Sequence, residues 1–278
     1  MLITNEDNFT HISNFLTDRE KIYLASTSSI MDKLKFRFRY CEKIRMDKIV
    51  HLPYFNNFEF VKIHTIPPTY PRNIKFIHLL TDTSNIPPNI THLSFRRRFN
   101  KPVEYIPLSV TYLKFGDYFD QSIEGIVSPS VTQLKLRWGF SHSIKNIPKS
   151  ITHLTLYCRF DRLTMGDIPS TVTHLKIGGR FDQNIKNNIP PSVTHLNIGY
   201  NFFRSIENDI PDSITHLYFN DEFEESLHFL PLSVKEITLS DEYLITDASI
   251  LDRIKIKRYR RHVYKYGFRK IYTCKIYL

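Results

Sequence analysis

The chain has 278 residues, 41% of them hydrophobic, which is enough apolar material to fill a core. Its net charge of +10 is concentrated near the C-terminus, because residues 251–278 hold ten Lys or Arg and one Asp. The rest of the chain is close to neutral, so the composition gives little reason to expect nucleic-acid binding. Three scattered cysteines, no apolar leader and no membrane-length apolar run argue against disulfides, a signal peptide and a membrane partner. We expect a soluble protein of the cytoplasm or a host cytoplasm, with the nucleus as the alternative.

Residues 1–40 precede the first repeat and predict three short helices. Thr17 and Glu20 have the spacing of a capping box, which predicts that the second helix begins at Asp18. The first helix would present four apolar residues on one face: Phe9, Ile12, Phe15 and Leu16. The apolar residues of the second helix are Ile22 and Leu24. A serine at position 28 or 29 would cap the third helix, which carries Ile30, Met31, Leu34 and Phe38.

This order of helix, Leu-Thr-Asp-Arg-Glu turn, helix, Ala-Ser-Thr-Ser break and helix resembles an F-box. That family docks on a Skp-type adaptor of cullin ubiquitin ligases and is often followed by repeats that hold the substrate. The chain departs from it in having Leu2-Ile3 where Leu-Pro is usual, and in lacking the Trp near the end of the third helix. The resemblance implies an adaptor-binding surface formed by Phe9, Ile12, Phe15, Leu16, Ile22 and Leu24. The alternative is a plain cap on the first turn, followed by a linker and further cap over residues 41–65.

One motif recurs with a period of 20 or 21 residues between residues 66 and 245. It reads Pro, two residues, Val or Ile, Thr-His-Leu, one residue, an apolar residue and then Phe. The proline position falls at residues 87, 107, 128, 148, 169, 190, 211 and 231, with Ser128 in place of proline. A weaker copy begins at Pro71. A period of this length marks a solenoid, in which each turn packs on its neighbours.

The Thr-His-Leu segment of each copy alternates polar and apolar residues, which predicts a short strand with one buried face. Strands that recur in one direction every ~20 residues must stack as a parallel ladder, about 4.8 Å apart. Such a period leaves no room for a return helix, so we expect extended return segments or 3₁₀ turns. The predicted fold class is a repeat solenoid, a leucine-rich-repeat-like parallel β ladder of about eight or nine turns. Short N-terminal helices would precede it, and a basic C-terminal cap over residues 246–278 would close it.

The repeats resemble the FNIP family, named for its Phe-Asn-Ile-Pro core. One stretch that carries the resemblance is Phe181-Asp182-Gln183-Asn184-Ile185, followed by Ile189-Pro190-Pro191-Ser192-Val193-Thr194-His195-Leu196. FNIP repeats are known from slime moulds and from giant DNA viruses of amoebae, and the resemblance implies protein interaction without enzyme activity. A recurring aromatic residue replaces the Asn ladder of standard leucine-rich repeats and should form a stacked spine: Phe99, Phe119, Phe140, Phe160, Phe181, Phe202, Phe223 and Tyr243.

Polar residues of the ladder should form columns on its exposed face. Five histidines share one slot: His92, His153, His174, His195 and His216. A His column could bind a metal, but no acid or thiol completes a site, so we expect hydrogen bonding along a half-exposed ladder. The Thr before each slot fits β-propensity and ladder hydroxyl bonds, because a nucleophile would need its own base.

An unknown protein target would bind this ladder face through its basic, aromatic and histidine side chains. The residues expected to bind it are Arg96, Lys114, Lys135, Arg137, Trp138, Tyr157, His153, His174, His195 and His216. For Trp138, packing between turns is an equal alternative.

No sequence motif points to catalysis, a metal or a cofactor, since neither a phosphate-binding loop nor an H-E-x-x-H motif occurs. The leading hypothesis is therefore a non-catalytic substrate receptor of a cullin-type ubiquitin ligase, and the alternative is a plain repeat scaffold. The tail alternates Ile254 and Ile256 with lysines before a basic run, which indicates a folded, charged cap. A nuclear signal or nucleic-acid contact is the alternative for this tail.

Overall fold

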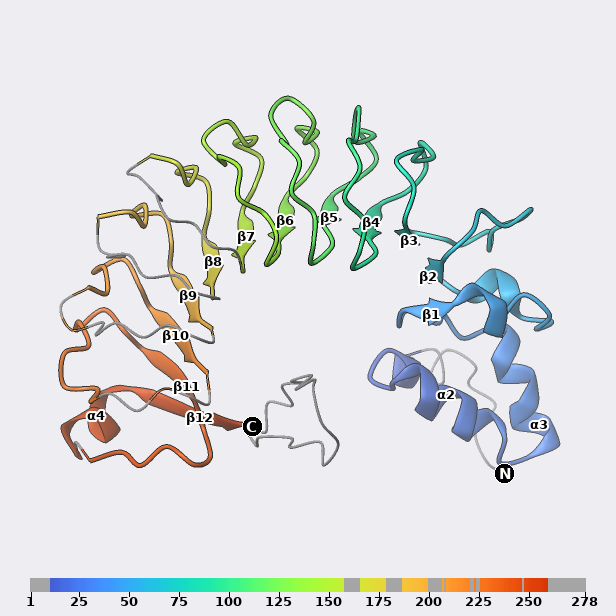
Figure 1. Cartoon of the computed structure of the whole chain (residues 1–278). Coiled ribbons are helices and arrows are strands. Elements are labelled where there is room, and N and C mark those ends of the chain that lie inside the picture. The colour runs from blue at the N-terminus through green and yellow to red at the C-terminus, as the bar shows by residue number, and fades with distance from the viewer. Residues whose placement is uncertain are drawn as a thin grey trace.

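The computed structural model describes residues 11–157, 166–178, 187–199, 207, 209–220, 223, 226–246 and 248–259. These residues form one parallel sheet of twelve strands, which lie side by side in chain order from β1 to β12. Figure 1 shows the strands along the inner side of an open arc, with the return segments on its outer side. The predicted parallel solenoid is confirmed.

The strands are short, as the repeat period requires. They are β1 (Ile44–Arg45), β2 (Phe60–Ile63), β3 (Phe76–Thr81), β4 (His92–Phe95), β5 (Tyr112–Lys114), β6 (Gln133–Leu136), β7 (His153–Leu156), β8 (His174–Ile177), β9 (His195–Ile198), β10 (His216–Phe219), β11 (Glu236–Ser240) and β12 (Lys255–Tyr259). The proline-headed copies and the weaker copy at Pro71 supply β3 to β11. The sheet is therefore wider at both ends than the segment 66–245 assigned to the repeats.

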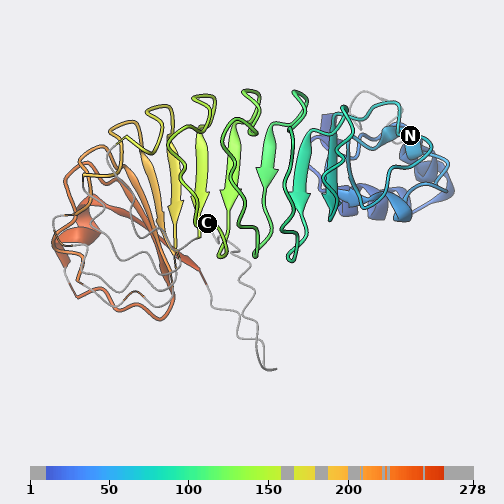
Figure 2. The ribbon, with the colours of Figure 1, turned by 45° about the horizontal axis from the view of Figure 1, so that its top comes forward.

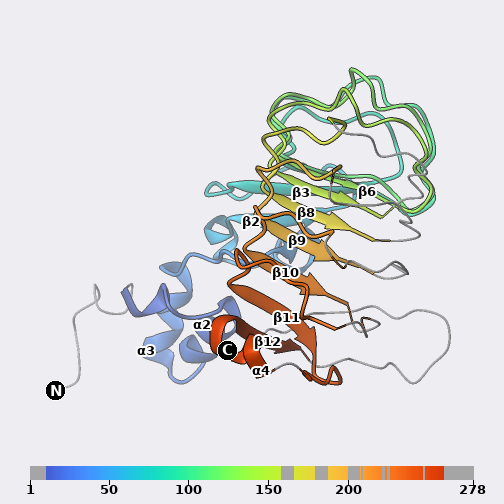
Figure 3. The same cartoon turned by 90° about the vertical axis from the view of Figure 1, so that its left-hand side faces the viewer.

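The helices and 3₁₀ turns lie near the two ends of the arc (Figure 2). They are α2 (Asp18–Ala25), α3 (Ser29–Asp32), η1 (Lys33–Phe36), η2 (Met46–Lys48), η3 (Phe55–Asn57) and α4 (Ala248–Arg253). None of the helices in the described ranges is long and apolar enough to span a bilayer. Figure 3 shows α2 and α3 set apart from the repeat turns.

The capping box is present as predicted. The Glu20 N–H donates to Thr17 Oγ1 at 3.2 Å, and the Thr17 N–H donates to Glu20 Oε2 at 2.7 Å. The first helix ends earlier than its apolar spacing predicts, since 11–13 are helical and 14–16 form a turn and bend. Phe15 and Leu16 thus lie outside it. The reason is that Thr17 caps α2 in an extended conformation, which the interior of a continuing helix does not allow.

The third helix was also predicted too long. Helix α3 ends at Asp32, η1 follows it, and Phe38 lies beyond both. Phe38 and Tyr40 instead enter the core, where the Tyr40 ring stacks on Phe58 with centroids 4.6 Å apart. Burying two large aromatic rings outweighs the weak local preference that would extend a helix of this length.

Each turn of the solenoid contributes a leucine at the centre of its strand, and these leucines are at most 2% exposed: Leu93, Leu113, Leu134, Leu154, Leu175, Leu196 and Leu217. The turn before each strand is closed by the N–H of the residue three after the proline, as from Val110 to the Pro107 carbonyl at 2.9 Å. Proline fits there because its missing N–H is not used. Ser128 serves equally, with its carbonyl 3.0 Å from the Val131 nitrogen.

The predicted aromatic spine is confirmed where the structure describes it. The Phe99 and Phe119 rings stack at 6.0 Å between centroids, and Phe119 and Phe140 at 6.4 Å, both pairs within 6° of parallel. At the other end, Phe223 stacks on Tyr243 at 5.6 Å. Phe160, Phe181 and Phe202 lie outside the described residues. Hydrogen-bonded strands stand about 4.8 Å apart, so wider aromatic layers in the core bend the ladder with its strands on the inner side.

A second ladder, of hydroxyl groups, was not anticipated from the sequence. The residue two after the proline position donates to a carbonyl of the preceding turn, as from Ser109 Oγ to Ile90 O at 2.7 Å. The same bond recurs from Ser130, Ser150, Thr171 and Ser192. These hydroxyls take the cohesive role that the Asn ladder has in standard leucine-rich repeats. The signal was the recurring Pro-x-Ser/Thr.

The described part of the C-terminal segment is folded against the last turn. Ile254 is buried, and β12 pairs in parallel with β11. Arg253 donates to the carbonyls of Leu230 and Pro231, and Arg258 to those of Ser240 and Tyr243. These cations satisfy carbonyls at the end of the solenoid, which is what a charged cap requires. Residues 260–278, which hold the rest of the basic run, lie outside the described residues.

Candidate functional site

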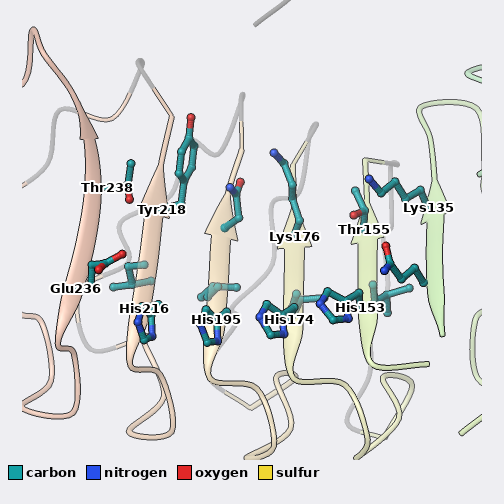
Figure 4. A pocket seen from close by; sticks show the side chains of 16 residues that line it. Lys135, His153, Thr155, His174, Lys176, His195, His216, Tyr218, Glu236 and Thr238 are labelled. Atoms are coloured by element: carbon teal, nitrogen blue, oxygen red, sulfur yellow. The ribbon is translucent and has the colours of Figure 1, made fainter. Parts of the chain in front are cut away.

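The inner face of the sheet presents two columns of polar side chains. In most repeat strands the first and third residues are partly exposed on this face, and the second and fourth are buried. The first column, in strand register from β5 to β11, is Tyr112, Gln133, His153, His174, His195, His216 and Glu236. The second column is Lys114, Lys135, Thr155, Lys176, Asn197, Tyr218 and Thr238. Figure 4 shows the two columns running side by side.

These columns line an open groove of about 340 Å³ that crosses β6 to β11. We call it the inner groove. It is built from the same two strand positions in successive turns, so it runs along the arc and perpendicular to the strands. Its shape suits an elongated partner better than a small molecule, because an enclosing wall is missing.

Four histidines of the first column form a continuous stack. Ring centroids are 4.2 Å apart for His153 and His174, 4.1 Å for His174 and His195, and 4.2 Å for His195 and His216. The interplanar angles are 12°, 16° and 7°. Both faces of His174 and His195 are therefore covered by neighbouring rings, which leaves the edges of these two rings open to a partner.

A threonine hydroxyl holds each of these rings. The Nδ1 atoms of His174, His195 and His216 lie 2.9 Å from the Oγ1 of the preceding threonine, and that of His153 lies 3.0 Å away. Sequence analysis predicted bonds from these hydroxyls along the ladder. The Thr173 hydroxyl does lie 3.3 Å from the Thr152 carbonyl of the preceding turn, but it lies closer to its own histidine ring. Within the described residues, the Nε2 atoms of these four rings make no hydrogen bond.

The stack favours neutral imidazoles. Burial, followed by repulsion from neighbouring imidazoles, lowers the pKa of His174 to about 4. Burial likewise lowers the pKa of His153 and His195. Among the described residues there is no group of three or more His, Cys, Asp or Glu able to hold a metal. Stacked rings direct their nitrogen lone pairs side by side, which does not converge on one ion.

Three lysines of the second column stand without a carboxylate partner among the described residues: Lys114, Lys135 and Lys176. Burial first, and neighbouring cations second, lower the pKa of Lys114 and Lys135. Lys135 Nζ lies 5.2 Å from the Tyr112 ring centroid, and Lys176 Nζ lies 5.5 Å from that of Tyr157. Aromatic rings thus partly compensate the charges of Lys135 and Lys176. The charge of Asp117 acts on Lys114 and opposes the lowering of its pKa, without forming an ion pair with it.

The acidic groups near the inner face are already neutralised. Asp117 pairs with Arg137 at 2.8 Å and with Arg97 at 3.4 Å. Glu236 pairs with Lys257 at 2.7 Å and with Lys255 at 3.7 Å. Although burial acts to raise it, the hydrogen bond and charge of Lys257 hold the pKa of Glu236 below its ordinary value.

The structure brings half of the predicted partner-binding residues together. Lys135, His153, His174, His195 and His216 line the inner groove, and Lys114 continues their face on β5. Arg96, Arg137, Trp138 and Tyr157 instead follow the ends of β4, β6 and β7, at the rim of the sheet. Sequence analysis did not select seven groove residues that share the strand positions of those it chose: Gln133, Thr155, Lys176, Asn197, Tyr218, Glu236 and Thr238.

At the rim, Trp138 is partly packed between turns and partly exposed. Its side chain remains 42% exposed, and its ring lies 6.1 Å from that of Tyr157 in the next turn. Arg137 also lies over the Tyr157 ring, 5.5 Å from its centroid. Arg96 is separate from them, with Nη2 3.3 Å from His64 Nδ1.

The predicted adaptor-binding residues are not all exposed. Ile12, Phe15 and Ile22 are exposed, whereas Leu16 and Leu24 are half-buried, and Leu24 packs on the core. Phe9 lies outside the described residues. Three further exposed hydrophobic residues of this segment were not selected: Tyr23, Ile30 and Phe36. Phe15 and Ile30 are the most open, each 80% exposed.

A single parallel sheet with short return segments, an inner groove and hydroxyl and aromatic ladders defines a leucine-rich-repeat-like solenoid. The chain belongs to the FNIP repeat family. The family model described as FNIP Repeat matches residues 81–118, 102–137, 140–180, 161–201 and 200–242, which together cover more than half of the chain.

Among solved structures, the chain is similar to CroV588, a giant-virus protein described as having a novel circular LRR protein structure. The sequence identity is 27% and the TM-score is 0.47. The match covers 68% of this chain and 34% of that protein, so this chain spans about a third of the length of its neighbour. No curated protein sequence matches the chain significantly.

Proposed function

We propose that this FNIP-repeat protein is a non-catalytic scaffold that holds a partner protein on the inner face of its sheet. The observation that carries the proposal is the inner groove, whose two columns repeat the same strand positions over six turns. Repetition of this kind builds an extended binding surface and gives no single residue a unique catalytic environment.

We further propose that the N-terminal segment recruits a Skp-type adaptor and through it a cullin, which would make the scaffold a substrate receptor of a ubiquitin ligase. The support is the F-box-like order of elements together with six exposed apolar side chains within residues 12–36: Ile12, Phe15, Ile22, Tyr23, Ile30 and Phe36. A mere cap would bury such residues against the first turn. Exposed apolar side chains gathered in one segment indicate a partner surface.

Affinity purification from amoebal lysate tests this proposal, with the full chain as bait. The test variant is Phe15→Glu/Ile30→Glu. The matched control is Leu232→Glu/Leu244→Glu, at positions 89% and 82% exposed near the other end. Both variants should fold, because the replaced side chains make little contact with the core.

We expect adaptor and cullin with the native chain and the control, and neither with the N-terminal variant. If the native chain recovers partner proteins but no adaptor, the scaffold stands and the ligase link is wrong. If it recovers no specific protein at all, the scaffold proposal itself fails.

A further inference from the structure

We propose that the inner groove binds an extended, acidic segment of the partner protein, with its carboxylates against Lys114, Lys135 and Lys176. This inference rests on the proposed scaffold function and specifies the chemistry of the partner. The segment would run along the arc and cross β5 to β10.

The first argument is charge. Lys135 and Lys176 line the groove, Lys114 continues the same face on β5, and no carboxylate of the described residues forms an ion pair with any of the three. The facing acids, Asp117 and Glu236, each already hold two cations. Burial, followed by repulsion from neighbouring cations, lowers the pKa of Lys114 and Lys135, so an anion placed between them would relieve an existing electrostatic cost. The groove is therefore complementary to a carboxylate-rich ligand.

The second argument is spacing. Lys114 and Lys135 occupy neighbouring strands, and Lys176 lies two strands further. Strand spacing places their Cα atoms about 5 and 10 Å apart along the arc. Alternate residues of an extended peptide lie about 7 Å apart on one face, within reach of long lysine side chains. From β5 to β10 the inner face of the sheet spans about 24 Å, the length of about seven extended residues.

The third argument is the hydrogen-bonding edge of the histidine stack. The Thr152 carbonyl already accepts from the Thr173 N–H at 2.9 Å and the His174 N–H at 3.1 Å. The Thr173 hydroxyl lies 3.3 Å from that carbonyl but 2.9 Å from His174 Nδ1. The Thr173 hydroxyl is therefore better placed to donate its hydrogen bond to His174 Nδ1. Since Nδ1 then accepts, the neutral ring carries its own proton on Nε2. Repeated at Thr194 and Thr215, this arrangement gives a row of N–H donors facing the partner.

The fourth argument separates a polypeptide from a nucleic acid. Bases bind single-strand grooves by stacking on open aromatic faces. Here those faces are covered, with Lys135 over Tyr112, Arg137 and Lys176 over Tyr157, and Tyr259 against Tyr218 at 5.3 Å.

The test is fluorescence anisotropy with the full chain and three labelled probes: a glutamate octamer, a glutamine octamer and a thymidine octamer of similar charge. We expect the glutamate octamer to bind at least about tenfold more tightly than either other probe. Lys135→Glu/Lys176→Glu should weaken it at least about tenfold, and Lys135→Gln/Lys176→Gln by less. The control, Lys145→Glu/Lys149→Glu, reverses two exposed charges between β6 and β7 and should change affinity less than about twofold.

Equal affinity for the two peptides would overturn the proposal, as would equal loss in the groove and control variants. Tighter thymidine binding that the groove variant abolishes would assign the groove to nucleic acid instead. Affinity purification from lysate with the groove variant as bait distinguishes failure of the acidic-segment proposal from failure of the proposed scaffold function. If the native chain and the groove variant recover the same partner proteins equally, the scaffold function stands, and the proposal that these lysines bind an acidic segment is refuted.

Discussion

At the scale of single residues, the repeat changes the chemistry of histidine. In isolation a histidine is half-protonated near neutral pH, but His174 lies between two imidazole rings and beside a threonine hydroxyl. Burial and the neighbouring rings lower its pKa to about 4. The slot therefore holds a neutral hydrogen-bonding ring. Its recurrence is visible in sequence, whereas the stacking that neutralises it depends on the strand register.

The first prediction concerns stability against pH. Unfolded histidine takes up a proton below about pH 6.5, whereas folded His174 does so only near pH 4. Between these values the unfolded state binds more protons, so lowering the pH destabilises the fold. His174→Gln should remove on the order of 1 kcal/mol of this loss between pH 7 and pH 4.5, after allowance for solvent screening.

Thermal denaturation at a series of pH values measures this difference between variant and native chain. His51→Gln, at an exposed position outside the stack, is the control. The other titratable groups around His174 are the same residues in the native chain and in both variants: Lys135, His153, His195, His216 and Glu236. Parallel curves for native chain and His174→Gln would contradict the account.

At the scale of elements, each repeat is a strand joined to a turn, and both could be predicted for identifiable reasons. The period-two alternation defined the strands, and the proline defined a turn that needs no N–H. The third helix was overpredicted, because local spacing does not report that Phe38 and Tyr40 are drawn into the core. The ladder of hydroxyl groups was not predicted, because a single small polar residue in each repeat does not by itself indicate a hydrogen bond to the preceding turn.

The second prediction tests that ladder. Ser192 Oγ donates to Val172 O at 2.8 Å, whereas the equivalent buried Ser213 Oγ has no partner among the described residues. Ser192→Ala should therefore lower the free energy of unfolding by about 1 kcal/mol. Ser213→Ala, the same change at the same repeat position, should leave it unchanged or raise it slightly. Urea denaturation gives both values, and equal losses would refute a stabilising role for the ladder.

At the scale of the whole molecule, the arc follows from spacings that differ across its thickness. Inner-face histidines stack at 4.1 to 4.2 Å, while the core phenylalanines stack at 6.0 to 6.4 Å. The repeat number, parallel order and exposed face could be predicted, because they follow from the period. The strands β1 and β2 could not be predicted, since they lack the repeat motif; β2 joins the sheet by pairing with β3, and β1 by pairing with β2.

The same scale explains why only part of the site was predicted. Lys135 and the histidines were selected by character and position, and they line the groove. Arg96, Arg137 and Trp138 were expected on the same face, but they lie past the strand ends, where the chain leaves the inner face. The two groups of residues differ in their position relative to the ends of the strands.

The central claim is that the inner face holds a partner protein. A photo-cross-linking amino acid placed at Thr155, in the inner groove, tests it most directly, with the same residue at the exposed Lys145 on the return segment as the control. After irradiation in lysate, we predict a cross-linked partner protein from position 155 and none from position 145. Cross-links from position 145 alone, or the same partner from both positions, would contradict the account.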